Sequence, residues 1–112
     1  MALLNVTFKS HILNMDCGAN VILPQSSPGN LLEKPFKTLY LLHGLSDDHT
    51  AWTRWTSIER YAAEYNLAVV MPNVCRSFYA DKKDSYQYFK FVSDELITIM
   101  QEMFLHDCNK LV

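Results

Sequence analysis

Glycine is scarce in this chain, whose 112 residues include only Gly18, Gly29 and Gly44. A strand-to-helix nucleophile elbow follows the pattern G-x-S-x-G and needs a glycine on each side of its serine. The segment that starts at Gly44, "GLSDD", has a serine in third place but no closing glycine. We therefore interpret Ser46 as a residue that hydrogen-bonds within a loop, not as a nucleophile.

Long apolar runs are absent as well, and no stretch approaches the roughly 18 residues that span a membrane. The N-terminus, "MALLNVTFKSHIL", lacks the basic region and the small-residue cleavage site that mark a secretory signal. No membrane association is expected, and the predicted location is cytoplasmic.

Neither sign of charge dominates, because 10 Lys and Arg stand against 12 Asp and Glu, for a formal net charge of −2. The basic residues are scattered and form no stripe with interleaved aromatics, so nucleic acid is not expected as a partner. With 49% hydrophobic and 20% charged residues, the composition is that of a folded globular chain. A length of 112 residues allows one domain with a modest core.

The three cysteines, Cys17, Cys75 and Cys108, are an odd number without C-x-x-C spacing. Neither a disulfide framework nor a zinc ribbon is indicated, and free thiols packed as small hydrophobes are the simpler interpretation. The run "DDH" at 47–49 could supply metal ligands or an acid–histidine pair, but adjacent residues rarely converge on one ion. We expect neither a metal nor another cofactor.

Hydrogen bonding within a loop is the favoured role of the "DDH" side chains. In this interpretation Asp48 or Thr50 caps a helical turn that runs through Trp52, because short oxygen-bearing side chains satisfy the first amides of a helix.

The first third of the chain predicts antiparallel strands and a loop. Residues 3–12 alternate apolar and polar side chains, with Phe8 on the apolar side, which is the period of a half-buried strand. Residues 19–23 predict a second, shorter strand, and Gly18 before it suits a hairpin bend or a bulge. The proline-rich residues 24–35 predict a surface loop.

A strand–helix–strand unit follows. Residues 37–44, "KTLYLLHG", are almost continuously apolar, which is typical of a parallel strand covered on both faces. Residues 56–66 predict a helix, and residues 67–72, "LAVVMP", predict another strand covered on both faces. This succession is a βαβ unit with a right-handed crossover.

Both ends of the helix at 56–66 carry signals. Thr56 and Glu59 have the spacing of a capping box, and Asn66 can adopt the left-handed conformation after the last turn. The expected buried stripe has helical spacing and consists of Ile58, Tyr61, Ala62 and Tyr65.

A second helix is predicted from about Tyr86 to Leu105, and residues 110–112 begin another apolar segment. The predicted buried face of this helix consists of Phe89, Val92, Leu96, Ile99, Met100 and Met103. The alternation predicts an α/β fold in which antiparallel first strands lead to a β-α-β-α succession and the start of a further parallel strand. We interpret the chain as the N-terminal part of a larger α/β domain.

Four segments carry a resemblance to a known family: "YLLHGLSDDHTAW" at 40–52, "VVMPN" at 69–73, "SFYAD" at 77–81 and "FVSDEL" at 91–96. In this order and spacing they resemble an α/β-hydrolase of the esterase D and tributyrin esterase type, related to S-formylglutathione hydrolases and mycolyltransferases. The resemblance implies that residues 1–112 form the N-terminal part of one α/β-hydrolase domain, truncated before the nucleophile elbow. The implied activity is that of a serine carboxylesterase with small, short acyl esters as substrates.

In such enzymes the loop after the third strand supplies one backbone N–H of the oxyanion hole. Carried over, the donor is the amide of Leu45, and Gly44 lets the backbone turn tightly without a Cβ. From His43 and Gly44 alone, the end of a strand is the simpler interpretation, and the other segments favour the oxyanion loop. His43 could orient its neighbours or transfer protons, and we favour the first role.

Two aromatic residues, Trp52 and Tyr79, are predicted to border the substrate. They follow strands whose carboxyl ends face the ligand in open α/β sheets, although aromatic residues also commonly fill cores.

The resemblance places the catalytic serine a few residues after Val112, with the acid and the histidine later still. This chain alone is therefore expected to be inactive. The alternative is a non-catalytic truncated product or a strand-pairing interaction module. In the family's sheet the third strand lies between the fourth and the fifth, so without the fifth strand residues 38–43 would form an exposed edge. Such an edge predicts a homo-oligomer or a partner strand.

Overall fold

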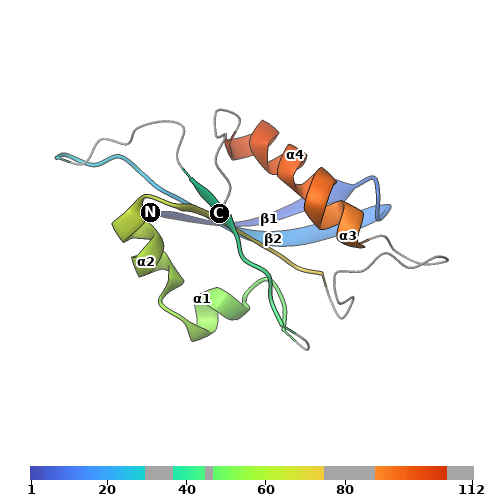
Figure 1. The fold of residues 1–112 in the computed structure, drawn as a ribbon, viewed down its shortest axis with the longest axis horizontal. Coiled ribbons are helices and arrows are strands. Elements are labelled where there is room, and N and C mark those ends of the chain that lie inside the picture. The colour runs from blue at the N-terminus through green and yellow to red at the C-terminus, as the bar shows by residue number, and fades with distance from the viewer. Residues whose placement is uncertain (30–36, 45–46, 75–87, 106–112) are drawn as a thin grey trace.

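The computed structural model of the chain describes residues 1–29, 37–44, 47–74 and 88–105. Within these residues, four strands form one mixed sheet in the order β1-β2-β4-β3. Their bounds are Ala2–Ser10 for β1, Met15–Leu23 for β2, Thr38–Tyr40 for β3 and Ala68–Pro72 for β4. Helices α1 (Ala51–Trp55) and α2 (Ile58–Tyr65) lie on one side of the sheet, and the helical segment at 88–105 lies on the other (Figure 1).

The predicted antiparallel start of the fold is confirmed. β1 pairs with β2 over its whole length, from Ala2 opposite Leu23 to Ser10 opposite Met15. β2 begins earlier than predicted, because the hairpin bends over residues 11–14. Asn14, at φ 52°, takes the left-handed conformation there.

The prediction that Gly18 forms a bend or bulge is wrong, since it lies within β2 opposite Thr7. A Cβ on Gly18 would lie 3.6 Å from Cε1 of His49, so the imidazole ring covers this glycine. This distance is an ordinary van der Waals contact, so the approach of His49 does not by itself require glycine here.

The predicted βαβ unit is confirmed: β3 and β4 are parallel, with Thr38 opposite Ala68, and α2 lies between them in the chain. β3 is shorter than the predicted strand at 37–44, although the amide of Leu41 still donates to the Val70 carbonyl at 2.9 Å. Beyond this point the carbonyl of Leu42 accepts a hydrogen bond from the Trp52 indole, so the chain has left the ladder.

The predicted capping box at the start of α2 is wrong. Thr56 ends α1, because its amide and its hydroxyl both donate to the Trp52 carbonyl, at 3.1 Å and 2.5 Å. The N-cap of α2 is Ser57, whose side chain makes no capping hydrogen bond. At the other end the prediction is confirmed, since Asn66 is left-handed at φ 51°.

The buried stripe predicted for α2 is narrower than expected. Ala62 is fully buried and Ile58 is half-buried, whereas Tyr61 and Tyr65 are 50% and 72% exposed. The α2 helix thus contacts the sheet through small and aliphatic side chains, and its tyrosines face outward.

The predicted second helix is present over residues 88–105, but its buried face differs from the prediction. Two π-helical turns, η1 (Phe91–Glu95) and η2 (Gln101–Leu105), flank α4 (Leu96–Met100), and α3 (Tyr88–Lys90) precedes them. The amide of Leu96 bonds to the carbonyl of Phe91, five residues back. This longer turn brings Phe91 onto the face of Leu96 and Met100, while Phe89 and Met103 are 59% and 49% exposed.

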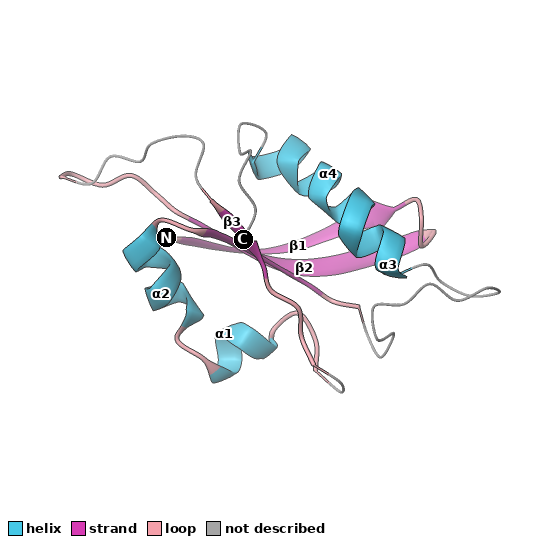
Figure 2. Ribbon diagram, viewed as in Figure 1, coloured by secondary structure: helices cyan, strands magenta, loops and turns pink. Residues whose placement is uncertain are grey.

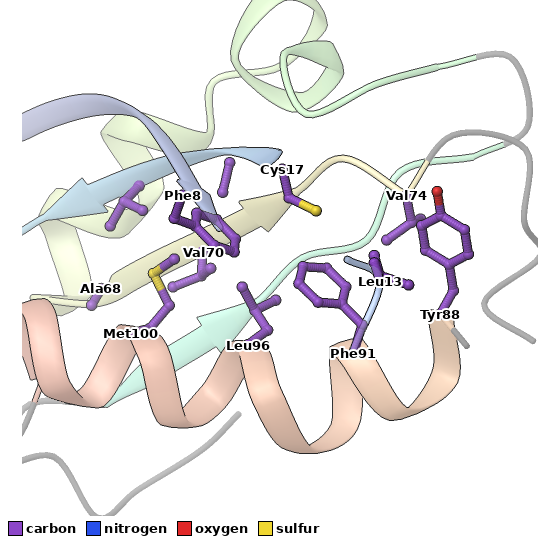
Figure 3. Close-up of a cluster of buried hydrophobic side chains, with 12 residues drawn as sticks. Phe8, Leu13, Cys17, Ala68, Val70, Val74, Tyr88, Phe91, Leu96 and Met100 are labelled. Carbon is purple, nitrogen blue, oxygen red and sulfur yellow. The ribbon is translucent and has the colours of Figure 1, made fainter. Parts of the chain in front are cut away.

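Alternate residues of β4 face opposite sides of the sheet and enter two separate cores. Figure 3 shows Phe91, Leu96 and Met100 pointing from their helix toward Phe8 and Val70. The larger core cluster consists of Phe8, Leu13, Cys17, Ala19, Val21, Ala68, Val70, Val74, Tyr88, Phe91, Leu96 and Met100. The smaller core cluster consists of Ile22, Ala62, Val69 and Met71.

Three further predictions concern the edge of the sheet, helices that could span a membrane and the strand expected at 110–112. In the described part of the chain β3 ends the sheet and pairs only with β4, as expected for an edge strand (Figure 2). None of the described helices is long and apolar enough to cross a bilayer. The strand expected to start at 110–112 lies outside the described residues.

Candidate active site

The loop that follows β3 contains the sequence-predicted site, and a buried histidine anchors it. His43 is 4% exposed. Its Nε2 accepts a hydrogen bond from the amide of Val74 at 3.0 Å, and its Nδ1 lies 2.8 Å from the carbonyl oxygen of Gly44. A backbone amide can only donate, so Nε2 is unprotonated and the ring proton is on Nδ1. His43 therefore joins the ends of β3 and β4, as its predicted orienting role requires.

The Gly44 carbonyl is held by two donors. Besides the His43 Nδ1–H, it accepts the amide of Asp47 at 3.2 Å, which uses both lone pairs of the oxygen. Among the described glycines only Gly29 has a positive φ, so a special dihedral is not the reason for Gly44. A Cβ there would lie 3.3 Å from Oδ2 of Asp47. The close approach of this carboxylate favours glycine at this position. The hydrogen bond from the Asp47 amide to the Gly44 carbonyl, three residues apart, fits the predicted tight turn.

Trp52 closes the loop from its far end. Its Nε1–H donates to the Leu42 carbonyl at 3.0 Å, and its half-buried ring packs against the smaller core cluster. The side chain predicted to border the substrate thus also fixes the distance between the end of β3 and α1.

The interpretation of Asp48 as a loop hydrogen-bonding residue is confirmed. Its Oδ1 accepts the amide and the hydroxyl of Thr50, at 2.8 Å and 2.5 Å, just before α1. The Thr50 hydroxyl lowers the pKa of Asp48, and the Thr50 amide, His49 and Arg54 lower it further. The described residues contain no group of three or more His, Cys, Asp or Glu side chains that could hold a metal ion.

His49 covers Gly18 on β2 and places the loop against the sheet. Its Nδ1 is buried and has no hydrogen-bond partner within the described residues. The amide of Asn73 donates to the Gly18 carbonyl at 2.9 Å, so the same glycine meets both the loop after β3 and the end of β4.

A polar depression of about 180 Å³ lies beside this loop. Its lining residues are Asp47, Asp48, Ala51, Arg54 and Trp55. The guanidinium of Arg54 lies 5.3 Å from the centroid of the Trp55 ring, a cation–π arrangement. The surface of the loop next to this depression is therefore charged and open to solvent, unlike the surface of the loop that faces the sheet.

Of the predicted site residues, Gly44 lies in this loop and Trp52 contacts it through the Leu42 carbonyl. Leu45 and Tyr79 lie outside the described residues, and so does Ser46, which was predicted to hydrogen-bond within the loop. No feature of the sequence pointed to the Val74 amide as the partner of His43. A backbone donor has no residue signature, and only the parallel pairing of β3 with β4 brings the two ends together.

Similarity to known proteins identifies the family of this chain. The Esterase family model matches residues 10–109. An acetyl esterase of Caldicellulosiruptor saccharolyticus is 33% identical over 110 residues, which cover 93% of this chain and 41% of that protein.

Two solved structures from Staphylococcus aureus resemble the chain closely. The substrate-bound fluorophosphonate-binding serine hydrolase F superposes with a TM-score of 0.83 at 39% identity, over 93% of this chain and 42% of that one. An S-formylglutathione hydrolase without ligand superposes with a TM-score of 0.78 at 39% identity and the same coverage. The chain therefore spans about two fifths of the length of these relatives and has the fold of the corresponding part of an α/β-hydrolase. It belongs to the Esterase family.

Proposed function

We propose that this chain supplies the oxyanion-hole loop of a cytoplasmic serine carboxylesterase that acts on short acyl esters. The observation that carries the proposal is the Gly44 carbonyl, which is held by two donors at the carboxyl end of β3. Ligands of open α/β sheets bind at the carboxyl ends of the strands. The family membership supports the same reaction class.

The proposed donor is the backbone N–H of Leu45. When a serine attacks the ester carbonyl, negative charge develops on the carbonyl oxygen, and a preorganised N–H stabilises it in the transition state. Trp52 and Tyr79 would border the acyl group. The serine, the acid and the histidine would come from a segment after Val112, so the chain by itself would not turn over.

A chimera tests this proposal. In it, residues 1–112 replace the matched 42% of the Staphylococcus aureus serine hydrolase that is 39% identical. The remaining segment of that hydrolase would contribute the triad. We expect the chimera to hydrolyse 4-nitrophenyl acetate and the isolated chain to be inactive. A chimera that unfolds cooperatively but has no esterase activity contradicts the proposal, and so does activity of the isolated chain.

Leu45→Pro in the chimera tests the donor itself, since proline has no amide hydrogen. Loss of one oxyanion-hole donor lowers kcat by about 10²–10³-fold. The matched control is Leu45→Ala, which keeps the amide and should keep most of kcat. Equal kcat values in the two variants would assign the oxyanion hole elsewhere.

The second candidate function is strand pairing, and the position of β3 at the end of the described sheet favours it. A strand edge pairs readily with a second copy or with a partner strand. Sedimentation of the isolated chain should then show association that increases with concentration. A monodisperse monomer that unfolds cooperatively would contradict this function and leave the esterase proposal intact.

A further inference from the structure

A groove between the β1–β2 hairpin and the helical segment at 88–105 has no part in the proposed reaction. This hairpin groove lies between residues 8–12 of the hairpin and residues 94–103 of the helical segment. We propose that it binds a small amphiphilic cation, that is, an apolar group that carries one ammonium. The inference goes beyond the proposed function and does not depend on it.

The hairpin groove has the size of a small-molecule site. Its volume is about 600 Å³, and pockets for small ligands range from about 300 to 1,000 Å³. The helical segment that forms one wall lies over β1 and β2, which form the other (Figure 2). Glu95 ties the two walls together, because its carboxylate accepts the hydroxyl of Ser10 and the amides of His11 and Ile12. The groove is therefore formed without a ligand.

The hairpin groove is separate from the candidate active site. In the described part of the chain β1 and β3 lie at opposite ends of the sheet, with β2 and β4 between them. Neighbouring strands are about 4.8 Å apart, so about 14 Å separates β1 from β3. The helical segment also covers the face of the sheet opposite to α1 and α2 (Figure 1). A ligand in the groove would leave the ester site open.

The floor of the hairpin groove is apolar. Phe8 is 6% exposed, and Ile12 and Ile99 are half-buried. Met103, which also lines the groove, is 49% exposed. An unbranched methionine side chain adapts its shape to an apolar neighbour. Burial of an apolar ligand group against these side chains would be favourable, because it removes their surface from water.

The charged side chains of the hairpin groove are mainly acidic. Three carboxylates line it, those of Asp94, Glu95 and Glu102, against the single ammonium of Lys9. The net charge of the lining is thus −2 when His11 is counted as neutral. The Glu95 carboxylate is occupied by the hairpin. The other two carboxylates form neither a salt bridge nor a hydrogen bond in the described part of the chain.

These charges determine which amphiphile fits. An ammonium near Asp94 or Glu102 gains a favourable Coulomb interaction, and a carboxylate in the same place is repelled. Lys9 by itself would favour an anionic amphiphile, but the carboxylates outnumber it. A simpler interpretation is that these side chains are a solvated surface that binds nothing. The matched ligands described next separate the three interpretations.

The probes share one apolar group and differ in charge. They are 4-phenylbutylamine, which is a cation, 4-phenylbutan-1-ol, which is neutral, and 4-phenylbutyrate, which is an anion. Isothermal titration calorimetry of the 112-residue chain measures each Kd. NMR of methionine methyl groups locates the ligand, because Met103 lines the groove whereas Met100 is fully buried in the larger core cluster.

We expect the amine to bind at least about 10-fold more tightly than the carboxylate, with the alcohol between them. The Met103 methyl signal should shift on titration, and the Met100 signal should shift much less. Raising the ionic strength to about 1 M should weaken binding of the amine more than binding of the alcohol, because salt screens exposed charges.

The double substitution Asp94→Asn and Glu102→Gln tests the rim. It removes two charges at nearly constant size from exposed positions, so the chain should stay folded. The amine should lose its advantage over the alcohol in this variant. The matched control is Glu59→Gln with Glu64→Gln, which removes two exposed carboxylates from α2 on the other face of the sheet. The control should keep the amine Kd within about 2-fold, because α2 lies beyond the screening length.

Three results would overturn the proposal: a carboxylate that binds as tightly as the amine, a Met103 signal that stays unchanged, or an equal loss of amine binding in the two double variants. Amine binding should also persist in the chimera. Binding to the chain but not to the chimera would mean that the rest of the enzyme covers the groove, and this too would overturn the proposal. An inactive chimera that binds the amine would contradict only the proposed function.

Discussion

The two faces of the sheet are stabilised by different interactions. On the face covered by the segment at 88–105, the larger core cluster buries aromatic and aliphatic side chains from both strands and helix. On the face covered by α1 and α2, the smaller core cluster has four buried residues. The loop from Leu41 to Trp52 depends there on hydrogen bonds from side chains to backbone groups.

This difference indicates a division of roles between the faces. Apolar burial is non-directional and stabilises the fold in proportion to the area removed from water. Hydrogen bonds to backbone groups contribute less net free energy but fix direction. Substitutions in the larger core cluster should therefore have the greatest effect on stability. Substitutions in the loop after β3 should have the greatest effect on the catalytic geometry. Each of the following substitutions is made in the chimera.

Phe91→Ala should have the largest effect on stability. Phe91 is fully buried and stacks on Phe8 with ring centroids 6.1 Å apart. Loss of a buried phenylalanine side chain costs about 3–5 kcal/mol in the free energy of unfolding. Urea unfolding measures this loss, and kcat of the folded protein should hardly change. The control is Phe89→Ala, at a 59% exposed position, and an equal loss in both variants would contradict the observed helix face.

Glu95→Gln should have the next largest effect on stability. The Glu95 carboxylate accepts the hydroxyl of Ser10 and the amides of His11 and Ile12, the latter two at 2.9 Å and 3.2 Å. It thereby ties the β1–β2 bend to the helical segment. Hydrogen bonds to a charged group are worth about 2 kcal/mol, so a loss of that order in urea unfolding is expected.

The control for Glu95 is the adjacent Asp94→Asn, at an exposed position on the same turn. It should leave the free energy of unfolding nearly unchanged. If the two variants lose the same amount, the carboxylate network does not contribute as proposed.

Trp52→Phe should cost about 1 kcal/mol of stability, the net value of one hydrogen bond, because phenylalanine keeps an aromatic ring but cannot donate to Leu42. Since the loop then loses an anchor, kcat should fall more than stability alone explains. Steady-state kinetics and thermal unfolding together measure this. The control is Trp55→Phe, at a position that is 73% exposed, and it should change neither kcat nor the melting temperature.

Asp48→Asn should have the smallest effect, and it should depend on pH. The pKa of Asp48 is lowered from its ordinary value of 3.8, chiefly by the Thr50 hydroxyl. A lowered folded-state pKa means that the charged carboxylate stabilises the fold above the ordinary value. This contribution is lost as the pH falls from 3.8 through the folded-state pKa.

The measurement compares the melting temperatures of Asp48→Asn and the unaltered chimera from neutral to acid pH. The difference should be constant at neutral pH and should shrink below the ordinary pKa of 3.8. A difference that grows in acid would contradict the direction of the shift. Asp16→Asn, at an exposed position on β2, is the control.

Much of the fold was predictable from the order of apolar and polar residues. The alternation in β1, the continuous apolar run of β4 and the left-handed Asn66 reflect local preferences that act over a few residues. The features predicted wrongly depend on contacts with distant segments. Gly18, predicted to form a bend, pairs with Thr7 of β1 and lies within its strand.

The buried face of the last helix shows the same limit. A period of 3.6 residues predicts Phe89 and Met103 inside, but the π-helical turns shift the face to Phe91. In the candidate site, the sequence predicted that a strand ends near His43 and Gly44, and the structure confirms that β3 is followed by a loop there. The partners of His43 were not.

The α/β succession, the parallel pairing of the two buried strands and membership of the Esterase family follow from the residue pattern along the chain. The folded chain, in contrast, sets which backbone groups contact the His43 imidazole and which carbonyl accepts the Trp52 indole N–H. Backbone donors and acceptors are the same at almost every position, so their pairing follows from the way the strand ends come together in space.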